Sequence, residues 1–190
     1  MTTKTVEPVE LVRLIHASPT RVCAVVTGGG VLSLAWLFGE PGASRTFLDA
    51  QVPYSMRALD EYVGVDAEQH VSPLEAARMA AAALTRAHHL AGPGGLVAGV
   101  SCTATIATDR PKKGDHRCAT AWRSTAGGSV FWLTLAKGER DRAGEEEVVS
   151  RLFLNTLAEA CGVDERVDLH LLEGETIVER RDSGSSGCLR

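Results

Sequence analysis

A threonine and three glycines, placed between a strand and a helix, are the first residues positioned to do chemistry. Residues 22–26 are small or β-branched apolar side chains that predict a buried strand, and a helical apolar pattern begins at Val31. The turn between them, Thr27-Gly28-Gly29-Gly30, leaves backbone N–H groups unpaired at the start of the helix, and such groups attract anions. We expect Gly28 and Gly29 to contact a ligand there. The Thr27 hydroxyl could cap the helix, bind that ligand or act as a nucleophile.

A second group of reactive side chains follows the apolar run 96–101, which predicts another buried strand. The hydroxyls and thiol of Ser101-Cys102-Thr103 come first, and a charged stretch over 109–117 follows. Its cations, Lys113 and Arg117 among them, suit an anionic polar ligand such as a nucleotide phosphate. His116 is the best candidate for general acid–base work near neutral pH. The plain structural alternative is a solvated charged loop.

Cys102 has two interpretations. A thiol close to Lys112, Lys113 and Arg117 would have a lowered pKa, which favours a nucleophile. A thiol that directly follows a buried strand is also often a small core residue.

Two shorter segments add polar groups at the ends of predicted elements. Tyr54 could stack on a flat ring or donate a hydrogen bond, and Ser55 could bind the same ligand or cap the next helix. Arg140 precedes an acidic helix and could reach a phosphate, or it could belong to a charged surface turn.

The composition is that of an ordinary globular chain. Its 190 residues, 44% hydrophobic and 23% charged, suffice for one sizeable core. The net charge of -4 favours neither nucleic acid nor an anionic membrane as a partner. No signal peptide or membrane span is evident, so we expect a cytoplasmic protein. Five cysteines without a CxxC pair predict neither a disulfide framework nor a metal site, and no cofactor is expected.

The order of elements predicts one α/β domain over residues 1–181, with three α/β/α layers around a mixed sheet, and a disordered tail over 182–190. Strands are expected at 22–27, 47–52, 96–101, 118–123, 129–136 and 169–178. Helices are expected at 9–17, 31–38, 56–63, 73–90 and 145–160. Residues 102–117 are expected to form a polar loop.

Taken together, the segments singled out above resemble the CinA-like C-terminal domain family, whose best-known members are nicotinamide-mononucleotide amidases. The resemblance covers residues 9–162, and 110–117 is similar to the branch fused to a cytidylyltransferase-like domain. It rests on these elements: Thr27-Gly28-Gly29, Pro41-Gly42-Ala43-Ser44, Pro53-Tyr54-Ser55, 59–65, Gly99-Val100-Ser101-Cys102-Thr103, Pro111-Lys112-Lys113-Gly114 and Gly138-Glu139-Arg140. It implies a three-layer α/β fold, a pyridine-nucleotide-like ligand, and hydrolysis of a carboxamide to a carboxylate and ammonia.

The chain departs from that family at the two residues that carry its reaction. The family's serine falls on Val25 or Val26, and its lysine falls on Leu59 or its neighbourhood, where the nearest cation is Arg57. Valine cannot attack a carbonyl and leucine cannot accept a proton, so the serine/lysine mechanism cannot be carried over. Two hypotheses follow: a hydrolase with a rebuilt site, using Thr27 or Cys102 as nucleophile and His116 as base, or a non-catalytic nucleotide-binding or regulatory domain.

Either hypothesis places one small-molecule pocket at the strand ends. We expect its wall to contain side chains from all four segments, namely Thr27, Tyr54, Thr103, Lys113, His116 and Arg140. The alanine-rich helix and the apolar strands would also allow a homodimer or homotrimer.

Overall fold

One mixed sheet organises the part of the chain that the structure, a computed structural model, describes, which is residues 4–110 and 113–183. Its six strands lie in the order β2-β1-β3-β4-β5-β6. They are β1 (Arg21–Thr27), β2 (Phe47–Gln51), β3 (Val97–Thr105), β4 (Arg117–Ser124), β5 (Gly127–Thr134) and β6 (Thr176–Ser183). β1 pairs in parallel with β2 and β3, and the remaining neighbours are antiparallel. The prediction of a mixed sheet is confirmed.

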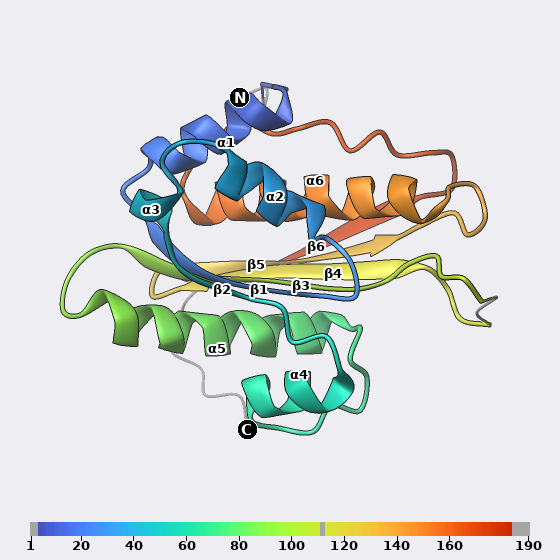
Figure 1. Ribbon diagram of the computed structural model, residues 1–190, viewed down its shortest axis with the longest axis horizontal. Coiled ribbons are helices and arrows are strands. Elements are labelled where there is room, and N and C mark those ends of the chain that lie inside the picture. The colour runs from blue at the N-terminus through green and yellow to red at the C-terminus, as the bar shows by residue number, and fades with distance from the viewer. Residues whose placement is uncertain (1–3, 111–112, 184–190) are drawn as a thin grey trace.

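Helices cover both faces of this sheet, which gives three layers (Figure 1). α4 (Met56–Val63) and α5 (Pro73–Ala91) lie on one face. α1 (Pro8–Ala17), α2 (Leu32–Gly39), the short α3 (Ala43–Thr46) and α6 (Arg142–Ala160) lie on the other. The single three-layer α/β domain expected from the order of elements is therefore confirmed.

Alternation along the central strands sorts their side chains between the two helical layers. On β1, Val22, Ala24 and Val26 belong to the large core packed under α1 and α6. Cys23 and Val25 belong to the smaller core under α4 and α5. Because successive strand side chains point to opposite faces, adjacent residues at the end of β1 or β3 serve different layers.

α5 lies unusually close to the sheet, as its alanine-rich sequence predicts. Ala76, Ala80, Ala83 and Ala87 are buried along its inner side. Gly99 of β3 lies directly beneath, where an added Cβ would stand 2.1 Å from the Ala80 carbonyl oxygen. The helix backbone thus rests on the strand backbone at this point.

Most predicted elements are present, and several boundaries differ; β5, for example, spans 127–134 rather than 129–136, and α6 begins at 142 rather than 145. β3 continues to Thr105, past Cys102, because residues 99–105 pair with 117–123 of β4. β6 occupies 176–183 rather than 169–178, so the boundary expected at 182 falls inside a strand. Residues 184–190, the rest of the expected tail, lie outside the described residues.

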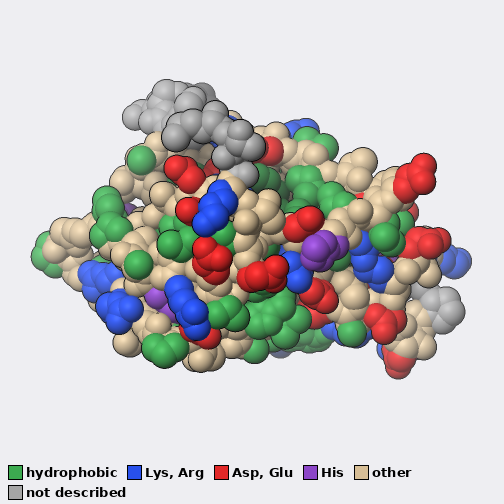
Figure 2. All heavy atoms as spheres, turned by 90° about the horizontal axis from the view of Figure 1, so that it is seen from above, with side chains coloured by type: hydrophobic (Ala, Val, Ile, Leu, Met, Phe, Trp, Pro, Cys, Tyr) green, Lys and Arg blue, Asp and Glu red, His purple; other side chains and the backbone are tan. Residues whose placement is uncertain are grey.

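The outer surface over α1, α2 and α6 is mixed in character. Figure 2 shows acidic and basic side chains interspersed across this face. Within the described ranges, none of the helices combines the length and the apolar character needed to cross a bilayer.

The close approach at Gly99 gives a stability prediction. We expect Gly99→Ala to lower the free energy of unfolding by about 3 kcal/mol, the upper end of overpacking costs, because the three atoms nearest to the added Cβ are all backbone atoms of α5. Gly39→Ala is the matched control, since nothing lies within 4 Å of its added Cβ. Urea unfolding of both variants checks this, and equal stabilities would contradict the close packing.

Candidate functional site

A small cavity lies at the carboxyl ends of β1 and β3, beside the start of α4. Its volume is about 140 Å³. It is lined by Thr27, Gly28, Tyr54, Ser55, Met56, Leu59, His70, Val71, Thr103 and Ala104. The carboxyl ends of parallel strands are where open α/β sheets place their ligands, so this cavity is the candidate site.

Two threonine hydroxyls form the sheet side of the cavity. Thr27 and Thr103 are register partners on β1 and β3, and both are buried. Thr27 Oγ1 donates to the Pro53 carbonyl at 2.8 Å, and Thr103 Oγ1 donates to the His70 carbonyl at 2.5 Å. Because each hydroxyl proton is already used, the two oxygens present acceptor lone pairs to the cavity.

His70 also lines this cavity, and sequence reasoning missed it. Its Nε2 lies 2.9 Å from Asp60 Oδ1 on α4. That same Asp60 oxygen also accepts the Ala67 N–H at 3.1 Å. No sequence pattern marks His70, because it meets Thr103 across 33 residues of chain.

Tyr54 and Ser55 stand at the rim. Tyr54 is 64% exposed, and its hydroxyl lies 3.4 Å from an Arg142 guanidinium nitrogen. Ser55 Oγ accepts the Ala58 N–H at 3.2 Å and so caps α4. The capping role considered for Ser55 is therefore present beside its position in the cavity wall.

The glycine turn does hold an anion, but that anion belongs to the chain itself. Glu146 of α6 accepts the Gly30 N–H at 3.0 Å through Oε2 and the Leu32 N–H at 2.9 Å through Oε1. Gly28 has φ +76°, and a Cβ there would stand 1.9 Å from the Ala104 carbonyl oxygen. The Gly30 and Leu32 N–H groups at the start of α2 are thus occupied by a carboxylate from α6, which lies in the same helical layer.

Cys102 lies away from the cavity, in the core beneath α6. Its Sγ is 3.5 Å from the Gly29 carbonyl oxygen and 3.7 Å from Cys118 Sγ. The hydrogen bond with Cys118 and complete burial hold the pKa of the Cys102 thiol well above its ordinary value. Since Cys102 and Thr103 are adjacent on a strand, only one of them can face the cavity, and that residue is Thr103. This environment does not make a nucleophile of Cys102.

His116 braces a loop instead of lining the cavity. It is buried, and its Nδ1 lies 2.7 Å from Glu145 Oε1. The other oxygen of Glu145 accepts the Ala107 N–H at 2.6 Å, and Arg142 donates to the Ala107 carbonyl at 2.8 Å. These contacts fasten the loop after β3 to the start of α6.

The predicted cations are likewise distributed elsewhere. Lys113 is exposed, and Lys112 lies outside the described residues. The Arg117 guanidinium lies over the Trp132 ring, 5.5 Å from its centroid. Arg140 donates to Glu175 and, at 2.6 Å, to the His170 carbonyl. Of the side chains expected to share one pocket, the structure brings together Thr27, Tyr54 and Thr103, and it leaves Lys113, His116 and Arg140 outside.

The two positions where the resemblance places a serine and a lysine form part of an apolar wall. Val25 and Leu59 belong to the same buried cluster and are 0% and 2% exposed. Val26 faces the other core, so Val25 is the residue that shares a layer with Leu59. Leu59 also lines the cavity, with a side chain that can neither donate nor accept a proton.

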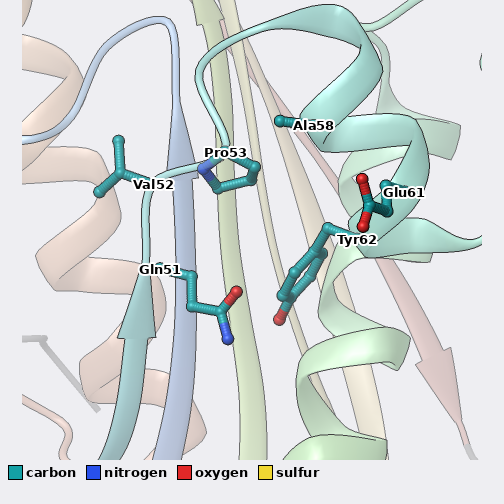
Figure 3. A pocket seen from close by; sticks show the side chains of 6 residues that line it. All are labelled: Gln51, Val52, Pro53, Ala58, Glu61 and Tyr62. Carbon is teal, nitrogen blue, oxygen red and sulfur yellow. The ribbon is translucent and has the colours of Figure 1, made fainter.

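A larger and shallower hollow lies on the other side of Pro53. It measures about 540 Å³ and is lined by residues from the end of β2 and from α4 (Figure 3). Gln51 and Tyr62 extend toward each other across it. Burial raises the pKa of Tyr62 to about 12, so its hydroxyl stays protonated and can only serve as a neutral hydrogen-bonding group near pH 7.

Metal binding has no support among the residues of 4–110 and 113–183. Within those ranges, no group of three or more His, Cys, Asp or Glu side chains is placed to hold a metal ion.

Comparison with solved structures places the fold among the competence/damage-inducible CinA proteins. Protein CihA from Agrobacterium tumefaciens is 20% identical, with a TM-score of 0.60 over 84% of this chain and 96% of that one. A CinA superfamily protein from Escherichia coli is 17% identical, with a TM-score of 0.63 over 80% and 87%. One from Klebsiella pneumoniae is 16% identical, with a TM-score of 0.65 over 83% and 99%.

These likenesses confirm the expected CinA-like fold, and at such identities they concern the fold alone. No family model matches the sequence, and the curated proteins contain no match.

The carboxylate in the glycine turn gives a second prediction. We expect Glu146→Ala to lower the free energy of unfolding by about 2–3 kcal/mol, because a buried N–H left unpaired costs about 1–3 kcal/mol. The neighbouring Glu147→Ala is the control; it removes only an ion pair with Arg151, worth about 0.5 kcal/mol. If chemical denaturation shows that both variants lose the same free energy of unfolding, the turn does not depend on Glu146.

The buried Glu175 gives a pH prediction. Burial acts to raise its pKa, but hydrogen bonds from the Leu172 and Ala136 N–H groups and from Arg140 outweigh burial and hold the pKa below 4.5. A lowered folded-state pKa means stability that is present above about pH 4.5 and lost as the pH falls further. We expect Glu175→Gln to lower the melting temperature at pH 7, and the difference from the parent to shrink below pH 4.5.

Glu173→Gln, an exposed change two residues away, is the control for that comparison. If the difference in melting temperature between Glu175→Gln and the parent stays constant from pH 7 to pH 4, the lowered pKa of Glu175 is contradicted.

Proposed function

We propose that this chain is a CinA-like domain that binds the carboxamide end of a pyridine nucleotide or related small molecule without hydrolysing it. One observation carries the proposal: the acceptor oxygens of Thr27 and Thr103 form one side of the cavity, while Leu59 lines it and Val25 belongs to the same apolar cluster as Leu59. Val25 is one of the two positions where the resemblance places the reacting serine, and Leu59 is where it places the lysine. These residues support binding of a carboxamide, and they do not support the serine/lysine reaction that the resemblance implies.

The acceptors favour a ligand group that donates hydrogen bonds. Thr27 and Thr103 each donate a hydrogen bond to a backbone carbonyl, so the remaining lone pairs of their oxygens suit an N–H₂ group such as that of a carboxamide. The volume of about 140 Å³ lies well below the roughly 300–1,000 Å³ of sites that enclose a drug-sized ligand. The cavity would therefore hold one end of a nucleotide, with the remainder lying outside against the exposed Tyr54.

One observation favours hydrolysis as a second candidate function. His70 lines the cavity and is held by Asp60 at 2.9 Å, an arrangement in which a histidine can take a proton from water. Water would then attack the carboxamide carbon, the C–N bond would break, and ammonia would leave with a proton returned by His70. This route needs neither Cys102 nor His116.

Titration calorimetry with nicotinamide mononucleotide tests the binding proposal. We expect Thr103→Val, which keeps the side-chain shape, to weaken binding about tenfold, the equivalent of one hydrogen bond of about 1.4 kcal/mol. Thr85→Val is the matched control, because Thr85 lies on the exposed side of α5 and bonds only to the Ala81 carbonyl. Equal binding by both variants, or none by the parent chain, would contradict the proposal.

An ammonia-release assay separates binding from hydrolysis. We expect no release from nicotinamide mononucleotide by the parent chain. Release that is lost in His70→Asn and retained in Cys102→Ala would replace the binding proposal with the hydrolytic one. Release that is lost in Cys102→Ala would contradict both.

A further inference from the structure

A cavity of about 510 Å³ lies under the segment between α4 and α5 and against the first two turns of α5. It is distinct from the site described above, and none of the residues lining the two is shared. Glu75 and Arg78 of α5 lie on one side of it, and Asp66 and Glu68 of the connecting segment lie on the other.

Glu75 is the unusual residue of this cavity. Its side chain is only 1% exposed, and its Oε1 has no hydrogen-bond partner among the described residues. Its Oε2 lies 3.7 Å from a guanidinium nitrogen of Arg78, which is too long for a good hydrogen bond. A buried carboxylate with an unpaired oxygen is costly, so its presence here calls for an explanation.

Burial is the main influence on the protonation of Glu75. It raises the pKa of the carboxyl; Arg78 and, more weakly, the nearby His70 act to lower that pKa, and Asp60 acts to raise it. A cation arriving beside Glu75 would stabilise the charged form, so the carboxyl gains more from a positive donor than from a neutral one.

The other residues that line the cavity also favour a positively charged ligand with apolar groups. Three carboxylates, those of Asp66, Glu68 and Glu75, face a single guanidinium, that of Arg78. Val65 and Leu74 also line the cavity and are 52% and 58% exposed. Apolar side chains beside an acidic group suit a ligand that carries methylene groups next to a positive charge.

We propose that this cavity binds a small organic cation, a primary alkylammonium, whose N–H donates to Glu75 Oε1 while its methylene groups lie against Val65 and Leu74. Asp66 and Glu68 attract the cation from solvent. The inference is independent of the proposed function, because it concerns a different cavity and a ligand of the opposite charge character.

Titration calorimetry with butylamine tests this, with butan-1-ol as the neutral probe of the same length. We expect saturable butylamine binding to the parent chain and at least tenfold weaker binding to Glu75→Gln, which keeps the side-chain shape and removes the charge. Glu147→Gln, remote on α6 and 47% exposed, is the matched control and should bind as the parent does. Butan-1-ol should bind to none of them.

A second variant keeps the proposal open to refutation should Glu75→Gln fail to fold. The double variant Asp66→Asn/Glu68→Gln changes only side chains of the exposed segment, and we expect it to weaken butylamine binding two- to fivefold at low ionic strength. The proposal is overturned by an absence of saturable butylamine binding, by equal binding of butylamine and butan-1-ol, or by unchanged affinity in a folded Glu75→Gln.

Discussion

The carboxylate of Glu146 in the glycine turn is the contact on which the arrangement of the site depends. It accepts hydrogen bonds from the Gly30 and Leu32 N–H groups. One side chain of α6 thus pairs the free N–H groups at the start of α2 and connects that helical layer to the end of β1. A helix N-terminus is an anion-binding position, and here the protein supplies the anion. A ligand at this end of the sheet must therefore be recognised by side chains on the other layer.

Strand alternation decides which side chains those are. Thr27 and Thr103 face the layer of α4 and α5, whereas their neighbours Val26 and Cys102 face the layer of α6. From their order in the sequence, the thiol, the hydroxyls, the cations and the histidine of 101–117 would be expected to form one site. Because β3 pairs with β4, these residues lie in different places. Cys102 and Thr103 face opposite layers, His116 contacts Glu145 at the start of α6, and Arg117 lies over the Trp132 ring.

Local features of the fold could be predicted from the sequence, and distant contacts could not. Ser55 and Ser72 cap helices, and Gly64 ends one with φ +81°, because each of these interactions lies within three or four residues of chain. Glu146 meets Gly30 across 116 residues, and His70 meets Thr103 across 33. Such contacts depend on how the sheet brings the elements together. The candidate site was therefore predicted at its threonines and at Tyr54 and Ser55, and missed at its histidine.

The apolar pair Val25 and Leu59 also bears on how such a domain can change over evolutionary time. A lysine at 59 would be surrounded by Val25, Met79 and other apolar side chains, and burial without a partner would lower its pKa, by about 3–5 units in extreme cases. A serine at 25 introduced first would be a buried hydroxyl with no base beside it. Either substitution made alone would therefore place a polar group without a partner in an apolar cluster, so a serine at 25 and a lysine at 59 could be accommodated only together.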